Sequence, residues 1–228
     1  MRAPEIERRS LLAGAQGISG PAIVIDTFRA FTTAAHLFNH GIAHIVLAET
    51  LDEARDRSAS IPGSLLCGEE GGRKPDDFDI GNSPTEVSQL RQLDGEVAVM
   101  RTSAGTRAVV AVLLGEARPV YAASLVVAGA TAATVADLPR VTIVAAGLSG
   151  ESTADEDEET AGLIADRLRL RRDDPNRLTR IRSGEGAERL RSTPWIDSHD
   201  LDLCLDIDRF SFAMRTQLED GVPVLRPE

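Results

Sequence analysis

The sequence is short of positive charge, and this shortage excludes whole classes of partner. Its formal net charge is -11 at pH 7. Nucleic acids and anionic lipids bind clustered cations, so we expect neither nucleic acid nor membrane as a partner. A small anionic substrate is still compatible, because a local pocket can oppose the overall sign.

Cysteines and long apolar runs are scarce too. The two cysteines, Cys67 and Cys204, lie in apolar runs and are expected to be packed thiols, not a disulfide framework. No apolar run approaches the roughly 20 residues that a membrane-spanning helix needs. Residues 1–20 lack the basic start and apolar stretch of a signal peptide. These absences predict a cytoplasmic protein.

Apolar runs typical of strands alternate with helical patterns along most of the chain. At 228 residues, with 42% hydrophobic and 27% charged residues, the composition predicts a single domain over residues 1–228. The alternation predicts a three-layer α/β/α sandwich around a mixed, largely parallel sheet. The expected strands cover 21–26, 42–48, 64–68, 96–102, 118–124 and 140–148, and the main helices 28–41, 50–60, 105–115, 127–138 and 153–171. Beyond residue 173 the chain is polar, with helical pieces near 186–192 and 197–207.

Ligands of open α/β sheets bind where strands end and lead into helices, and four such loops are rich in polar residues. In the first, "DTFRAFTT", Asp26 ends a strand and Arg29 follows three residues later. The carboxylate suits a hard cation such as Mg²⁺, and the guanidinium suits phosphate. A helix cap followed by an exposed arginine is the alternative interpretation.

The second loop, "GEEGGRKPDDFDIGNSPTE", combines glycines with both signs of charge. Backbone amides at Gly71 and Gly72 can approach an anion closely. Glu69 offers hard oxygen ligands, and Arg73 and Lys74 offer countercharge. A solvated surface loop is the alternative.

The far end of this loop predicts a helix start. Ser83 is expected as the N-cap, Pro84 as the first helical residue and Glu86 as the partner in a capping box. Asp79 and Asn82 should close the loop just before it.

The third loop, "RTSAGTRA", has the composition of a phosphate cradle. Thr102, Ser103 and Thr106 present hydroxyls beside the free amides of a helix N-terminus, Gly105 loosens the turn, and Arg107 adds charge. An ordinary Ser/Thr helix cap would look the same.

The fourth loop, "GLSGESTADEDEE", ends in consecutive acidic residues at a helix start, which the helix dipole favours without any ligand. The same position brings Glu156 and Asp157 toward the sheet edge of Asp26 and Glu69. Carboxylates gathered beside hydroxyls and arginines are typical of a divalent-metal site.

Taken together and in this order, "VIDTFRAFTTA", "GEEGGRKPDDFDIGNSPTE", "TSAGTRA" and "EDEETAG" resemble the motifs of the 2-phosphosulfolactate phosphatase (ComB-like) family. The tail "DLDLCLDIDRFSFAMRTQLEDGVPVL" is similar to that family's end, so the resemblance runs from Pro21 to Leu225. It implies an Mg²⁺-dependent phosphatase that releases phosphate from a phosphosulfolactate-like ester in the pathway to coenzyme M.

Four positions depart from the family's usual motifs. Phe31 replaces a threonine, Glu70 an arginine, Ala104 an asparagine and Thr160 a cysteine. A carboxylate in place of a cation, and a lost amide donor, both weaken anion binding at the matching positions. An inactive anion-binding or regulatory relative is therefore the second functional hypothesis.

The residues and the resemblance together assign roles. Metal ligands are expected at Asp26, Glu69, Glu156 and Asp157, with Mg²⁺ or Mn²⁺ as the ion because these ligands are all hard oxygens. Catalytic roles are expected for Asp26, Arg29 and Arg107. Phosphate binding is expected at Gly71, Gly72, Arg73, Thr102, Ser103, Gly105 and Thr106.

Two mechanisms fit these roles. A metal-activated water can attack the phosphorus, or Asp26 can attack it and form an aspartyl-phosphate. The sequence "DTF" lacks the D-x-D arrangement of common aspartyl phosphatases. We expect the four loops to surround one pocket, since parallel neighbouring strands bring such loops to the same edge of a sheet. A homodimer is compatible with a chain of this size.

Overall fold

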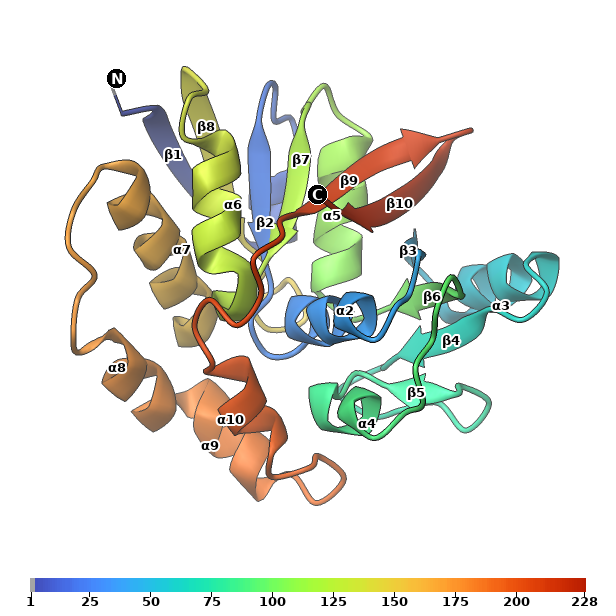
Figure 1. The fold of residues 1–228 in the computed structure, drawn as a ribbon. Coiled ribbons are helices and arrows are strands. Elements are labelled where there is room, and N and C mark those ends of the chain that lie inside the picture. The colour runs from blue at the N-terminus through green and yellow to red at the C-terminus, as the bar shows by residue number, and fades with distance from the viewer. Residues whose placement is uncertain (1–2) are drawn as a thin grey trace.

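In the computed structural model, which describes residues 3–228, ten strands form one sheet (Figure 1). Their order across the sheet is β1-β8-β2-β7-β9-β10-β3-β6-β4-β5. The strands are β1 (Glu5–Ser10), β2 (Ala22–Ile25), β3 (His44–Ala48), β4 (Leu65–Gly68), β5 (Ile80–Gly81), β6 (Val97–Arg101), β7 (Val120–Ala123), β8 (Arg140–Ala145), β9 (Met214–Glu219) and β10 (Val222–Pro227). All six strands expected from the sequence are present.

The helices lie in the connections between these strands. They are α1 (Leu11–Ala15), α2 (Ala30–Asn39), α3 (Leu51–Ser60), α4 (Pro84–Ser88), α5 (Gly105–Leu113), the 3-10 turn η1 (Leu125–Val127), α6 (Ala128–Val135), α7 (Asp155–Leu168), α8 (Arg177–Ser183), α9 (Glu185–Ser192) and α10 (Asp200–Cys204). On the block β1-β8-β2-β7, α6 and α7 contact each other and cover one face, while α1 and α5 contact each other and cover the opposite one (Figure 1). The expected three-layer α/β/α arrangement is confirmed.

The sheet consists of two parallel blocks joined by an antiparallel hairpin. Strands β1, β8, β2 and β7 run parallel, and so do β3, β6, β4 and β5. The hairpin β9–β10 lies between β7 and β3 and is antiparallel to both. The prediction of a mixed, largely parallel sheet is therefore confirmed, but the two blocks are not one continuous parallel sheet.

The hairpin and the edge strands β1 and β5 were not expected from the sequence. Strand β1 is largely exposed at the sheet edge, so "EIERRS" lacks an apolar run. Strand β9 alternates buried and exposed residues at its start, and the turn uses Asp220 and Gly221 with φ of 50° and 80°. An Asp-Gly pair is a strong hairpin signal, so the sequence did contain the information for this element.

Local predictions hold at most helix ends. Gly41 follows the end of α2 with φ of 96°, a conformation that glycine adopts without strain. At α4, Ser83 Oγ accepts from Glu86 N at 3.1 Å. The other half of the capping box, in which the Glu86 carboxylate would accept from Ser83 N, is wrong. The carboxylate instead accepts from Gly81 N at 2.7 Å and so holds the end of β5.

Strands close to the centre of the sheet are apolar because helices cover both faces. All four residues of β2 are fully buried. Cys67 and Cys204 are free thiols inside this core, as expected, and burial raises the pKa of both. Within residues 3–228, no helix combines the length and the apolar character needed to cross a bilayer.

Candidate active site

The polar loops meet in a cavity of about 340 Å³. It is lined by the loops that follow β2, β8, β4 and β6, together with residues of α9 and the segment after it. In Figure 1 the block containing β4 and β6 lies roughly crosswise to β2 and β7, and its strands lead toward the ends of β2 and β7. The predicted convergence is correct, but its reason is not. The loops come from two blocks of parallel strands that are separated by the hairpin β9–β10, and not from one continuous parallel sheet.

Four buried carboxylates line this cavity. Asp26 ends β2, Glu69 follows β4, and Glu156 and Asp157 begin α7; all four residues are at most 6% exposed. These are the four residues predicted as metal ligands. Because they share one buried space, their negative charges repel one another, and ionising all of them is unfavourable.

Burial, and at Asp26 and Asp157 also the repulsion between these carboxylates, raises the pKa of three of the carboxyls. Burial, and then the charges of Glu69 and Glu156, raise the pKa of Asp26 to about 7, although the Ala30 amide opposes the shift. Burial, and then the charges of Asp26 and Glu156, raise the pKa of Asp157 well above its usual value. Burial also raises the pKa of Glu156. A cation placed among these groups would reduce the repulsion between the carboxylates and favour their charged forms.

Backbone amides fix two of the carboxylates in orientation. Asp157 accepts from Thr27 N at 2.7 Å and from Gly147 N at 2.9 Å, so it ties the loops after β2 and β8 to α7. Asp26 is held less tightly, since its Oδ1 accepts from Ala30 N at 3.2 Å. Each carboxylate has further lone pairs that these contacts leave available.

Glu69 is held by groups that the sequence assigned to phosphate. It accepts from Gly72 N at 2.6 Å, from Ser103 N at 2.5 Å and from Ser103 Oγ at 3.0 Å. Gly71 N donates to Ser103 Oγ at 3.2 Å. Gly71, Gly72 and Ser103 do line the cavity, as expected, but their amides serve to build the loop around Glu69.

Three other residues assigned to phosphate or catalysis lie outside the cavity lining. Thr102 and Thr106 are buried and cap α5 reciprocally: Thr102 N donates to Thr106 Oγ1 at 2.9 Å, and Thr106 N donates to Thr102 Oγ1 at 3.2 Å. The Arg107 guanidinium contacts the Ser103 carbonyl at 3.4 Å. The threonine hydroxyls thus bond backbone amides of this turn, as in the helix-cap alternative, but the N-cap residue itself is Ala104, which makes no side-chain cap.

Gly105 has a positional role beside Asp26. It does not line the cavity, but a Cβ atom there would lie 2.7 Å from Asp26 Oδ2 and 3.0 Å from Ala30 Cβ. The glycine therefore allows the start of α5 to pack directly against the loop that carries Asp26.

Arg29 is the predicted arginine that does line the cavity, and its partner was missed. The buried Asp200 accepts from Arg29 Nη1 at 2.7 Å, from Ser83 Oγ at 2.7 Å and from Thr85 N at 3.0 Å. One carboxylate of α10 thus holds the arginine and the N-terminus of α4 together. Asp200 lies among several aspartates in "DSHDLDLCLDI", and no sequence signal separates it from its exposed neighbours.

Sequence reasoning also missed the cavity's outer side. Arg189 lies 3.9 Å from Glu156. Arg73, which was predicted to bind phosphate, is not among the lining residues, and its guanidinium lies 5.9 Å from the centre of the Trp195 ring. Five large apolar side chains line the remaining surface: Phe28, Leu148, Leu190, Trp195 and Ile196. Such side chains carry no pattern that distinguishes them from core residues.

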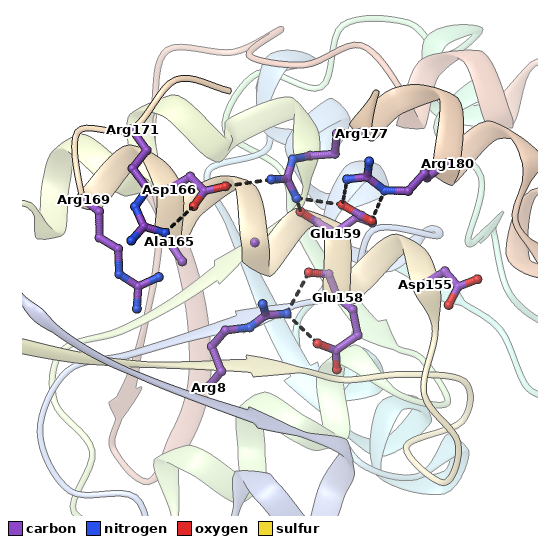
Figure 2. Close-up of a pocket in the computed structure, with 11 residues that line it drawn as sticks. Arg8, Asp155, Glu158, Glu159, Ala165, Asp166, Arg169, Arg171, Arg177 and Arg180 are labelled. Atoms are coloured by element: carbon purple, nitrogen blue, oxygen red, sulfur yellow. Dashed lines mark hydrogen bonds and ion pairs between the residues drawn. The ribbon is translucent and has the colours of Figure 1, made fainter. Parts of the chain in front are cut away.

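The other acidic residues at the start of α7 line a second, larger cavity of about 620 Å³ (Figure 2). There Glu158 pairs with Arg8 at 2.6 Å, and Glu159 pairs with Arg177 at 2.8 Å and with Arg180. Glu158 and Glu159 line this second cavity, whereas Glu156 and Asp157 line the first. Only part of the acidic run therefore serves the candidate site.

The cavity fits a divalent cation in one particular way. Across residues 3–228, no three Asp, Glu, His or Cys side chains form a ready-made cage for a metal. Mg²⁺ does not need such a cage, because it keeps several waters and is usually bound through one or two carboxylates plus substrate phosphate. Asp26 and its buried neighbours offer ligands of this kind.

Comparison with known proteins places the chain. The sequence model of the 2-phosphosulpholactate phosphatase family matches residues 10–218. The chain is similar to a probable 2-phosphosulfolactate phosphatase of Deinococcus radiodurans, with 40% identity over 149 residues, which cover 64% of this chain and 61% of that protein. A protein of the same name from Thermus thermophilus is 38% identical over 151 residues, covering 64% and 60%.

A further relative matches over a longer span. The probable 2-phosphosulfolactate phosphatase of Synechococcus sp. strain WH7803 is 33% identical over 237 residues, which cover 90% of each chain. The matches to the Deinococcus and Thermus proteins span about three fifths of those relatives' length. The family's sequence model covers most of the chain, and the buried carboxylates lie in the loops that resembled the family's motifs. The chain therefore belongs to the 2-phosphosulpholactate phosphatase family.

Proposed function

We propose that the protein hydrolyses a small phosphate monoester of the 2-phosphosulfolactate type, releasing inorganic phosphate, and that it requires Mg²⁺ or Mn²⁺. The observation that carries the proposal is the meeting of Asp26, Glu69, Glu156 and Asp157 in one cavity beside Arg29. Family membership supports the reaction, and the charge of the cavity supports the ion.

One or two of the buried carboxylates, Asp26 and Asp157 first, would hold the cation, with Glu69 and Glu156 beside them. A bound divalent cation polarises a phosphoryl group and lowers the pKa of a bound water. Asp157 is oriented for this task by its two amide contacts. Burial, and then the charges of Glu69 and Glu156, raise the pKa of Asp26 to about 7, so a neighbouring cation would favour its charged form.

Arg29 would stabilise the negative charge of the transferring phosphoryl oxygens. Its Nη1 is fixed by Asp200 at 2.7 Å, and its Nη2 lies 3.4 Å from the Gly72 carbonyl. Such anchoring keeps the guanidinium in place before the substrate arrives, so little reorganisation is needed in the transition state. Asp200 therefore supports the site from behind.

Of the four departures from the family motifs, one lines the cavity and the other three, Phe31, Glu70 and Thr160, do not. Ala104 lines it, where the family has an amide side chain. Glu70 does not: its side chain is largely exposed and lies 3.5 Å from Arg101. The loss of the amide at position 104 supports the second candidate function, a relative that binds phosphate esters without hydrolysing them.

Phosphate release from a panel of monoesters, 2-phosphosulfolactate included, separates these functions. Metal-stripped protein should be inactive, and Mg²⁺ or Mn²⁺ should restore turnover. Asp26→Asn should abolish it, while Asp202→Asn, at an exposed ion pair with Arg182, is the matched control with parental activity. Full activity in excess chelator would rule out the ion.

Two further measurements complete the test. If calorimetry shows ester binding but no ester releases phosphate, the non-catalytic function is correct. The stereochemistry at phosphorus distinguishes the two mechanisms, because direct attack by water inverts the configuration of a chiral phosphate monoester, whereas two successive displacements through an aspartyl-phosphate retain it.

A further inference from the structure

The two arginines that line the candidate active site are held in different ways. Arg29 is buried, and its Nη1 donates to the buried Asp200 at 2.7 Å. Arg189, in α9, has 40% of its side chain exposed, and its contact with Glu156 Oε1 is 3.9 Å long, beyond hydrogen-bonding distance. Its guanidinium donates no hydrogen bond to any residue of the described range 3–228. The N–H groups of Arg189 are therefore available to a ligand.

The packing of α9 against α7 brings Arg189 to the cavity. Gly186 lies three residues earlier in α9, and a Cβ atom there would collide with the Glu156 carboxylate. Residues three apart lie on the same face of a helix, so the face of α9 that packs against Glu156 also carries Arg189. Helix packing therefore places this guanidinium at the cavity without a hydrogen bond to hold it.

A substrate of the 2-phosphosulfolactate type needs more positive charge than the phosphate site supplies. Such an ester carries a phosphate, a carboxylate and a sulfonate, and all of them are anionic at neutral pH. Arg29 and the divalent cation serve the phosphoryl group in the proposed function. No lysine or histidine of the described chain lines the cavity, so Arg189 is the cationic side chain of the lining that is left for another acid group. An anionic group that enters a cavity without a countercharge loses hydration with no compensation.

The two arginines also lie beside different parts of the lining. Arg29 lies next to the glycine-rich loop, with Nη2 3.4 Å from the Gly72 carbonyl, whereas Arg189 lies next to Glu156 at the start of α7. In the ester, the carboxylate is bonded to the phosphorylated carbon itself, and the sulfonate is on the neighbouring carbon and so reaches farther from the phosphate. The acid group farther from the phosphate fits the arginine that the phosphate does not use.

We propose that the Arg189 guanidinium binds the sulfonate of the substrate and thereby determines specificity. Its N–H groups lie in one plane and can donate to two oxygens of an oxyanion at once. The proposal rests on the proposed hydrolysis of a phosphosulfolactate-type monoester and adds the residue that recognises its second acid group.

Three phosphate esters test which group Arg189 recognises. 2-Phosphosulfolactate has both acid groups, 2-phospholactate lacks the sulfonate, and 2-sulfoethyl phosphate lacks the carboxylate. Arg189→Gln should lower kcat/KM for the two sulfonate esters by roughly 10- to 100-fold, as expected when a hydrogen bond between charged groups is lost. The same variant should hydrolyse 2-phospholactate almost as the parent does. Arg191→Gln is the matched control, because Arg191 lies in the same helix with an equal exposure of 40% but outside the cavity lining.

Binding can be measured without turnover. 3-Sulfopropylphosphonate and propylphosphonate have no ester bond to hydrolyse, and they differ only in the sulfonate. Calorimetry in the presence of Mg²⁺ should show that the parent protein binds the sulfonated compound at least about tenfold more tightly. Arg189→Gln should bind the two compounds equally, whereas Arg191→Gln should keep the parental preference.

Two results would overturn the proposal. If Arg73→Gln abolishes the preference for the sulfonated phosphonate and Arg189→Gln retains it, the sulfonate is bound by the arginine beside Trp195. If Arg189→Gln weakens all three esters and both phosphonates to the same extent, Arg189 acts on the phosphate or on the fold and not on the sulfonate.

The outcomes also separate this proposal from the proposed function. If no ester releases phosphate but the parent prefers the sulfonated phosphonate and Arg189→Gln does not, the hydrolysis is refuted and sulfonate recognition is supported. If the esters are hydrolysed but the parent binds the two phosphonates equally, the phosphatase function is correct and the role of Arg189 is refuted.

Discussion

Removal of the Asp200 carboxylate tests how the protein holds Arg29 in the cavity. Asp200 and Arg29 have side-chain exposures of 0% and 7%, and their charged atoms are 2.7 Å apart. Taking away one partner of a buried ion pair leaves the other charge without compensation, at a cost of about 3–5 kcal/mol. Asp200→Ala would also leave Ser83 Oγ and Thr85 N without their acceptor. We therefore expect a loss of free energy of unfolding at the upper part of that range.

The same short helix supplies a matched control. Asp202 pairs with Arg182 at 3.0 Å, but both side chains are more than half exposed. Exposed pairs contribute at most about 1 kcal/mol, so Asp202→Ala should have little effect. Urea denaturation measures both variants, and a shifted midpoint with an unchanged slope identifies a change in stability. Asp200→Asn, which keeps one oxygen acceptor, serves if the alanine variant fails to fold.

A double variant distinguishes an uncompensated charge from lost packing. Arg29→Met combined with Asp200→Leu removes both charges and should cost less than the sum of the two single changes, because no buried charge is left alone. We expect the double variant to be inactive, since Arg29 is the residue proposed to stabilise the transferring phosphoryl group. The reasoning is refuted if Asp200→Ala is no more costly than Asp202→Ala, or if the two single effects simply add.

Two other changes test the carboxylate cluster. Because the pKa of Asp26 is about 7 in the folded protein and about 4 when unfolded, the folded state binds more protons between these values, and stability falls as pH rises through that window. In chelator, Asp26→Asn should therefore reduce the slope of the free energy of unfolding against pH from 4 to 7, and an unchanged slope would mean that Asp26 ionises normally. Gly105→Ala places a Cβ 2.7 Å from Asp26 Oδ2 and should displace this carboxylate. We therefore expect kcat/KM to fall on the order of 100-fold, while Tm changes little. Parental kinetics in this variant would show that the position of Asp26 is not critical.

Local sequence information was enough for most elements of the fold. Residues 21–26 and 140–148 are strands because their apolar runs suit a sheet covered on both faces, and Gly41 and Ser83 delimit helices through backbone conformation and capping. The placement of Asp26, Glu69, Glu156 and Asp157 directly after strands also followed from the sequence. A strand-to-helix loop has to emerge at the carboxyl end of its strand, whatever the order of the strands.

Long-range arrangement could not be read in this way. The hairpin of β9 and β10 lies in the middle of the sheet although it comes last in the chain. Because it is antiparallel to both β7 and β3, the strands of the two parallel blocks run in opposite directions. Strand order depends on which surfaces bury one another best, and this is a property of all the elements together. The loops that follow strands of both blocks therefore line the same cavity.

By itself the sequence determined six of the strands, the main helices and the three loops that carry the buried carboxylates, because these follow from periodicity, glycine and capping within a few residues. Only the tertiary structure decided which polar groups share a space. It paired Asp200 with Arg29 across 171 positions, turned Glu156 toward the cavity and Glu158 toward Arg8, and brought Trp195 to the mouth of the site. Burial, ion pairing and cavity shape arise from contacts between distant segments, and no local pattern of residues encodes them.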